Sequence, residues 1–110
     1  MHEYLAAAEV AAANGLHAPA HHHAMHALEL GLKAALIADG EPPVRTHNPA
    51  GQFGHRFRGR VPDETLRSIN RALARYHEMR YPGGSMEVEE IEEALAFARR
   101  FLVDRLPALL

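Results

Sequence analysis

The chain lacks cysteine altogether, and its 110 residues carry a formal net charge of only −2. Without cysteine there are no disulfides, no thiolate metal ligands and no thiol nucleophile, which fits a reducing compartment. Without a strong charge of one sign there is no overall positive field to attract nucleic acid or acidic membranes. Any contact with nucleic acid must therefore come from a local basic patch.

Long apolar runs are also missing. No stretch approaches the roughly 20 apolar residues needed to cross a bilayer, and Met1 to Tyr4 lacks the basic start of a signal peptide. We therefore expect a soluble, cytoplasmic protein that makes no membrane contact.

Residues typical of strands are few. Threonine occurs only at positions 46 and 65, and no stretch alternates apolar and polar residues for long. Alanine, leucine, glutamate and arginine, which favour helices, dominate instead. The composition, 47% apolar and 24% charged, is that of a globular chain. At this length we expect one all-α domain spanning residues 1–110.

Glycine and proline divide the chain into helical segments. Asn14-Gly15, Asp39-Gly40 and Tyr81-Pro82 mark helix ends. The segments expected to be helical are about 2–13, 19–38, 50–57, 63 to before Pro82, and 86–106.

Three of these segments carry apolar residues at helical spacing, and their polar side chains are expected to face solvent. Two of these polar side chains, Glu29 and Lys33, are expected to pair on an exposed face. Such stripes predict an antiparallel, up-and-down bundle of four to five helices. The stripes are Met25, Leu28, Leu32, Ala35 and Leu36; Leu66, Ile69, Leu73 and Tyr76; and Val88, Ile91, Leu95, Ala98 and Leu102.

The order of several motifs resembles the HEPN family over about residues 4–106. The helix from His22 to Leu36 is similar to the HEPN signature helix. It is followed by Thr46-His47, by Arg80-Tyr81-Pro82-Gly83, and by the acidic start of the last helix from Glu89 to Ala98. Phe53-x-x-x-Phe57 followed by Val61-Pro62-Asp63 also resembles a branch of small bacterial HEPN-like proteins.

The resemblance implies a helical bundle that forms a homodimer. Many family members are metal-independent ribonucleases, often paired with a minimal nucleotidyltransferase as toxin and antitoxin. Others have lost catalysis and serve as nucleotide-binding or assembly modules. We therefore expect RNA or a nucleotide as ligand, a minimal nucleotidyltransferase as partner, and no cofactor.

The resemblance assigns catalysis to Arg71 and His77, because active members have an arginine and, after four to six intervening residues, a histidine. Five residues separate the two here. Histidine can move a proton near neutral pH, and arginine can bind phosphate oxygens through its planar fork. Active members usually place a polar residue directly after the arginine, where this chain has Ala72. The alternative is that both residues lie on an exposed helical face.

A cluster of arginines is the best candidate for a nucleic-acid or nucleotide surface, with Arg75, Arg80 and Tyr81 as its expected contacts. Tyr81 alternatively packs under the last helix, and the arginines alternatively pair with Glu87 to Glu93. The cluster comprises Arg56, Arg58, Arg60, Arg67, Arg71, Arg75 and Arg80.

Nine histidines form another conspicuous group, in which His22 and His26 lie one helical turn apart. Such a pair can bind zinc. The chain has neither a His-Glu-x-x-His motif nor cysteine ligands. We therefore assign no metal and expect the histidines to cover the helix start or to pack at a dimer contact.

Overall fold

The structure is a computed structural model that describes residues 1–45, 48–79 and 86–110. Within these ranges it contains helices and no β-strand, apart from one isolated bridge between Arg58 and Val61. The predicted all-α fold is therefore confirmed. The helices are α1 (His2–Ala13), α2 (His17–Ala38), α3 (Ala50–Phe57), α4 (Asp63–Glu78) and α5 (Val88–Arg100), followed by η1 (Phe101–Arg105) and η2 (Leu106–Leu109).

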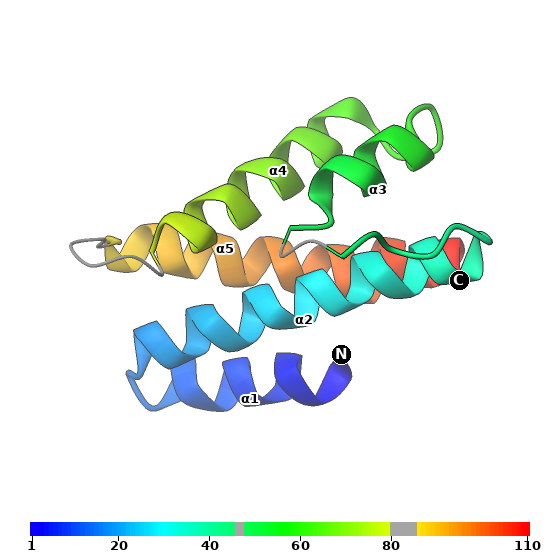
Figure 1. The fold of residues 1–110 in the computed structure, drawn as a ribbon. Helices are drawn as coiled ribbons and strands as arrows, with labels where there is room; N and C mark the ends of the chain where they lie inside the picture. Colours follow the sequence, from blue (N-terminus) through cyan, green and yellow to red (C-terminus); the bar gives the residue numbers. More distant parts are fainter. Residues whose placement is uncertain (46–47, 80–85) are drawn as a thin grey trace.

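The long helix α2 is the centre of the bundle. It packs against α1, α3, α4, α5 and η2. Figure 1 shows that α1 and α2 form an antiparallel pair, that α4 runs back over α2, and that α5 runs beside α2. The four longer helices α1, α2, α4 and α5 thus alternate in direction, as the sequence predicts, whereas the short α3 runs roughly along α2. Helix α2 begins at His17, two residues before the expected start, so Pro19 lies in its first turn.

Two of the three predicted apolar stripes are buried along their whole length, namely those of α2 and α4. The stripe of α5 is partly wrong, because Val88 is exposed and Leu95 is only half-buried. Phe101, Leu102 and Leu106 complete the core instead, each no more than 1% exposed.

The last helix changes its geometry near its end. The α-helical part ends at Arg100, short of the expected residue 106, and continues as a π-helical turn in which the Leu106 N–H donates to the Phe101 carbonyl. Pro107 contributes to this change because it has no N–H with which to extend the α-helical ladder. The wider turn allows Phe101, Leu102 and Leu106 to face the core together.

The closest approach between α2 and the C-terminal segment is at Gly31. A Cβ atom at this position would lie 2.5 Å from Cδ2 of Leu102 and 3.1 Å from Cδ2 of Leu106. Both leucines are fully buried, so their side chains have little room to move. The absence of a side chain at Gly31 is therefore what allows α2 and the end of the chain to pack so closely.

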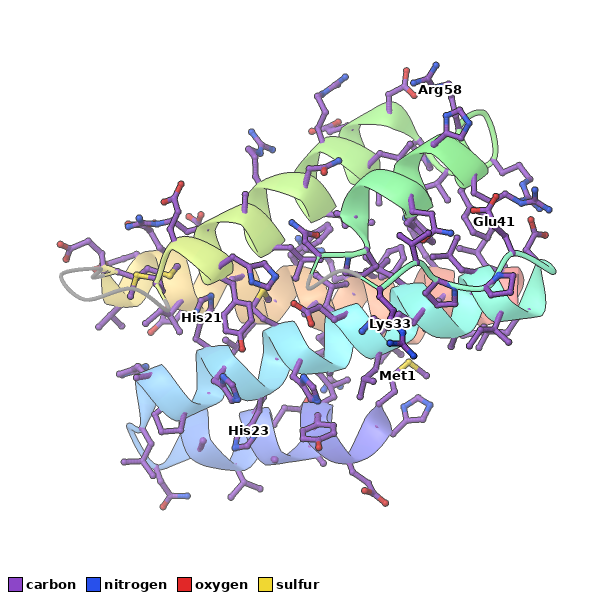
Figure 2. The ribbon with its side chains drawn as sticks, viewed as in Figure 1. Met1, His21, His23, Lys33, Glu41 and Arg58 are labelled. Atoms are coloured by element: carbon purple, nitrogen blue, oxygen red, sulfur yellow. The ribbon has the colours of Figure 1, made fainter. Side chains whose placement is uncertain are left out.

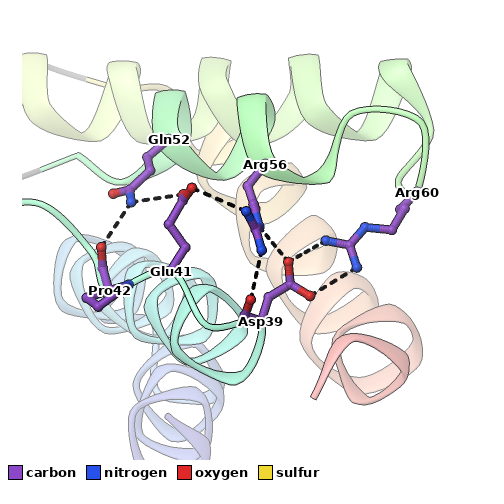
Figure 3. A network of polar contacts seen from close by, with 6 residues as sticks. All are labelled: Asp39, Glu41, Pro42, Gln52, Arg56 and Arg60. Atoms are coloured by element: carbon purple, nitrogen blue, oxygen red, sulfur yellow. Dashed lines mark hydrogen bonds and ion pairs between the residues drawn. The ribbon is translucent and has the colours of Figure 1, made fainter.

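Asp39, just beyond the end of α2, joins that helix to α3 and to the turn after it (Figure 3). Its carboxylate accepts from Arg56 Nε at 2.6 Å and from Arg60 Nη2 at 2.6 Å. These hydrogen bonds, with Arg60 first and Arg56 second, lower the pKa of Asp39 from 3.8 to about 2. The adjoining loop is held by Gln52, which donates to Glu41 and to the Pro42 carbonyl at 3.1 Å each.

We expect Gly31→Ala to disturb the α2 crossing. Overpacking against Leu102 should cost about 1–3 kcal/mol, which exceeds the gain of about 1 kcal/mol from replacing a helical glycine. Gly54→Ala is the matched control, because a Cβ there meets only Asn70 Nδ2 at 4.0 Å. Urea unfolding should show Gly54→Ala more stable than the wild type and Gly31→Ala less stable. Equal stabilisation by both would contradict the close crossing.

Asp39→Asn should change how the stability of the protein declines as the pH falls. Because folding lowers the pKa of Asp39, its contribution is fully present above its ordinary pKa of 3.8 and is lost as the pH falls through about 2. Thermal unfolding between pH 7 and pH 2 should show a lower Tm for the variant at neutral pH and a shallower decline between pH 4 and 2. Asp104→Asn, at an exposed carboxylate, should leave the curve unchanged.

Candidate functional site

A row of polar side chains runs along α2, a helix whose remaining faces are largely apolar. His22, His26, Glu29 and Lys33 are spaced four, three and four residues apart, which places them on one face of a helix. We call this row the α2 polar stripe. Figure 2 shows Lys33 on the visible side of α2, with His23 on the side of the helix toward α1. Glu29 is the one buried member of this row, and a buried charged side chain calls for a physical explanation.

Glu29 and His77 form the centre of the stripe. Glu29 is only 8% exposed, so the expectation that it faces solvent with Lys33 is wrong. Its Oε1 lies 2.9 Å from Nε2 of His77, which α4 contributes. The two atoms are within ion-pair distance but are not aligned for a straight hydrogen bond, and neither has a hydrogen-bond partner among the described residues. A buried carboxylate needs such a counterpart, because removing it from water is costly.

This contact determines what the His77 ring can do. A carboxylate next to Nε2 favours a proton on that nitrogen, which leaves Nδ1 as the hydrogen-bond acceptor. Nδ1 has no hydrogen-bond partner in the described part of the chain. The ring is therefore oriented on one side by a carboxylate while its other nitrogen is free to accept a proton, an arrangement used by acid–base catalysts.

Tyr76 makes a second polar link between α4 and the α2 polar stripe. Its hydroxyl lies 2.8 Å from Nδ1 of His22. At the other side of the stripe, the ring of Tyr4 from α1 meets His26 edge-on, with 4.4 Å between ring centroids. The stripe is therefore bordered by one tyrosine from α1 and one from α4, which hold the two histidines in place.

Arg71 lies away from this site. It is exposed, it lines a groove between α4 and α5, and its guanidinium donates to Ser68 Oγ at 3.3 Å. Six positions along an α-helix turn a side chain to a direction about 120° away, so Arg71 and His77 face different sides of α4. The structure does not bring the two predicted catalytic residues together within one chain, and their joint role stays a prediction.

Of the three residues predicted to contact RNA or a nucleotide, the structure describes only Arg75. Arg75 pairs with Glu78 and with Glu90, at 3.3 Å each, and these contacts raise its pKa. Its charge is therefore partly neutralised. Arg80 and Tyr81 lie outside the described residues, as does the Thr46-His47 motif.

The arginine cluster likewise separates into paired and unpaired members. Arg56 and Arg60 are bound to Asp39. Arg58 and Arg67 have no ion pair within the described ranges, and they line a groove of about 580 Å³ between α3 and α4. His55, Asn70 and one acidic residue, Asp63, line the same groove. Arg58, Arg67 and, in the groove between α4 and α5, Arg71 are thus the described members of the cluster that make no ion pair within the described residues.

His21 is the second buried polar residue of α2. It is 5% exposed, and its Nε2 has no hydrogen-bond partner in the part of the chain that the structure describes. Burial, assisted by His22 and Arg75 and opposed by Glu90, lowers the pKa of His21 below 6.5. Protonation of this ring therefore disfavours folding, and its effect on stability appears as the pH falls below 6.5.

The described residues contain no group of three histidine, aspartate or glutamate side chains arranged to hold a metal ion. Nor does any helix in the described ranges have the length and apolar character needed to cross a membrane. The rings of His22 and His26 are nearly parallel, 2° apart, with centroids separated by 6.3 Å.

The sequence analysis missed the burial of Glu29 and its contact with His77. The spacing of Glu29 and Lys33 is typical of an exposed ion pair, and it masked the longer polar row to which both belong. The signal was present, however, because His22, His26, Glu29 and Lys33 share one helical face. The contact with His77 joins residues 48 positions apart in the chain, and no local pattern could reveal it.

Comparison with known proteins supports the resemblance found in the sequence. A family model described as the HEPN domain matches residues 2–104. No curated protein and no solved structure matches the chain significantly. The family match covers nearly the whole chain, and the helical bundle agrees with it. The chain therefore belongs to the HEPN domain family.

Proposed function

We propose that this HEPN protein acts on RNA or a nucleotide, with His77 as its acid–base group and Glu29 as the residue that positions it. The observation that carries the proposal is the buried contact between Glu29 Oε1 and His77 Nε2, at 2.9 Å. A carboxylate held in the central helix is costly for folding, and its one described counterpart is a residue type suited to proton transfer.

The chemistry that fits this arrangement is metal-independent cleavage of RNA, as expected of a toxin nuclease. His77 would take the proton from a 2′-hydroxyl, whose oxygen attacks the neighbouring phosphorus. The bond from phosphorus to the 5′-oxygen of the next nucleotide breaks, and that oxygen takes up a proton from water. The developing charge on the phosphate needs a cation. Lys33 lies one turn beyond Glu29 on the α2 polar stripe and is half-buried, whereas Arg71 faces another side of its helix. We therefore assign Lys33 to the phosphate.

The unpaired arginines give the RNA a place to bind outside the catalytic pair. Arg58 and Arg67 line the α3–α4 groove without an ion pair in the described residues. Fixed cations along a groove bind phosphates without regard to sequence. The proposal thus moves the expected contacts from Arg75, which is paired, to Arg58 and Arg67.

A second function, in another class, is a non-catalytic module that dimerises and binds a minimal nucleotidyltransferase. Two observations favour it: Arg71 and His77 face different sides of α4, and Ala72 replaces the polar residue usual in active members. The two functions differ in a simple readout. An interaction module would co-purify with the co-expressed nucleotidyltransferase and would leave RNA intact.

His77→Ala should abolish RNA cleavage in the presence of EDTA, because general acid–base catalysis contributes about 10²–10⁴-fold. Glu29→Gln should lower kcat by at least about tenfold while leaving KM nearly unchanged, because it disturbs the orientation of the ring and not substrate binding. His2→Ala, at an exposed histidine of α1 outside the α3–α4 groove, is the matched control and should retain full activity. Cleavage that survives His77→Ala would rule out this mechanism.

Replacing both Arg58 and Arg67 with alanine should weaken the binding of single-stranded RNA. Each lost phosphate contact lowers the magnitude of the slope of log K against log salt by about 0.7. The slope for the double variant should therefore be smaller in magnitude by about 1.4. Fluorescence anisotropy at several salt concentrations measures this slope. Arg105→Ala removes an exposed arginine outside the groove and should change neither affinity nor slope. An unchanged slope in the double variant would place the RNA elsewhere.

A further inference from the structure

Helices α3 and α4 form an antiparallel pair, joined by the turn at residues 58–62 (Figure 1). The α3–α4 groove, of about 580 Å³, lies between them. Each helix contributes one face to this groove, with positions 51, 54, 55 and 58 from α3 and positions 63, 66, 67 and 70 from α4. Spacings of three and four residues place each set on a single side of its helix. The groove is therefore bounded on both sides by rigid elements.

The α3 side of this groove is open because two of its positions are glycine. Neither Gly51 nor Gly54 has a positive φ. A Cβ at Gly51 would meet no neighbouring atom within 4 Å among the described residues, and one at Gly54 would meet only Asn70 Nδ2, at 4.0 Å. Glycine is unfavourable inside a helix, so packing gives no reason for these two, unlike Gly31. A glycine does allow a ligand to lie directly against the backbone.

Asn70 faces Gly54 from α4, and its amide has a fixed orientation. Its Nδ2 donates to the Leu66 carbonyl at 3.1 Å. Because that carbonyl can only accept, the amide nitrogen must face it, and Oδ1 lies on the other side of the amide. Oδ1 accepts no hydrogen bond in the described part of the chain. Asn70 therefore offers a ligand in the groove an acceptor oxygen in a fixed place.

Positive charge and an aromatic ring lie along the same groove. Arg58 and Arg67 make no ion pair within the described residues, although Asp63 also lines the groove. Asp63 is in the first turn of α4, where the free N–H groups of the helix favour a carboxylate. Two guanidinium groups and one carboxylate leave the groove with a net positive charge. The exposed ring of His55 adds a surface on which a base can stack.

We infer that the α3–α4 groove holds one unstacked base of single-stranded RNA and prefers a base with an exocyclic amino group. The flat base lies against the α3 backbone at Gly51 and Gly54, and its amino group donates to Asn70 Oδ1. The flanking phosphates reach Arg58 and Arg67. Cytosine and adenine carry such an amino group, whereas uracil has a carbonyl acceptor where cytosine has its amino donor. The inference rests on the RNA-binding part of the proposed function and adds the residue that reads the base.

Oligocytidine and oligouridine give a matched comparison, because their bases differ chiefly in this amino or carbonyl group. Strands of about ten nucleotides are long enough for a site of this kind. With 2′-O-methyl riboses they have no 2′-hydroxyl to attack the phosphate, so binding is measured without cleavage. Fluorescence anisotropy should give the wild type a Kd for oligocytidine about fivefold below that for oligouridine, as expected for one added hydrogen bond.

Substitutions at position 70 test the base-reading role. Asn70→Ala removes the acceptor and should bring the two Kd values together, while the slope of log K against log salt stays as in the wild type. Asn70→Asp keeps an acceptor oxygen and should keep the preference for cytosine, although its negative charge weakens the binding of both strands. Replacing Arg58 and Arg67 with alanine should weaken both strands alike and leave the preference intact.

Gly51→Leu tests the open side of the groove. The free space around this position allows the variant to fold, which circular dichroism checks, and the added side chain should occupy the place of the base and remove the preference. Ala6→Leu, at an exposed position of α1, is the matched control and should bind both strands as the wild type does.

Equal affinity of the wild type for the two strands, no binding of either strand, or a cytosine preference that survives Asn70→Ala or Gly51→Leu would each overturn the inference. Cleavage of unmodified RNA at His77 is a separate measurement. A protein that cleaves RNA but binds both strands equally would leave the acid–base proposal standing and remove the base-reading role. A protein that prefers cytosine but leaves RNA intact would do the reverse.

Discussion

The contact between Glu29 and His77 fixes how α4 lies on the bundle. Glu29 is buried in the central helix, and a buried carboxylate strongly favours the position in which a counterpart reaches it. His77, near the end of α4, is that counterpart at 2.9 Å, and Tyr76 beside it reaches His22 at 2.8 Å. These contacts hold the end of α4 over α2, while α3 packs against α4. An open groove lies between α4 and α5.

The central helix has two kinds of surface, and each has its own role. Its apolar positions hold the bundle together, with Gly31 allowing the end of the chain to cross closely. Its polar stripe is bordered by Tyr4 of α1 and Tyr76 of α4, and its Glu29 contacts His77 of α4. A small domain has little core to spare for polar groups, and the burial of Glu29 in this stripe is the reason for the acid–base role that we propose.

Much of the fold follows from local patterns in the sequence. Helix bounds at His2–Ala13 and Ala50–Phe57, and the buried faces of α2 and α4, were predictable because glycine, proline and apolar spacing determine them locally. The π-helical turn after α5 and the exposure of Val88 were not predictable, because they depend on how α5 packs against α2. The arginine cluster could be recognised in the sequence, but its paired and unpaired members could not be told apart, because Arg60 pairs with Asp39, 21 positions earlier. Long-range pairing of this kind leaves no local signal.

The most direct test is the tautomer of His77, read by two-dimensional ¹H–¹⁵N NMR of the imidazole rings at about pH 8, where histidine is ordinarily neutral. If Glu29 orients the ring, His77 carries its proton on Nε2 in the wild type, and Glu29→Gln shifts the ring toward a mixture of tautomers. A proton on Nδ1 in the wild type, or identical His77 signals in both proteins, would contradict the role assigned to Glu29.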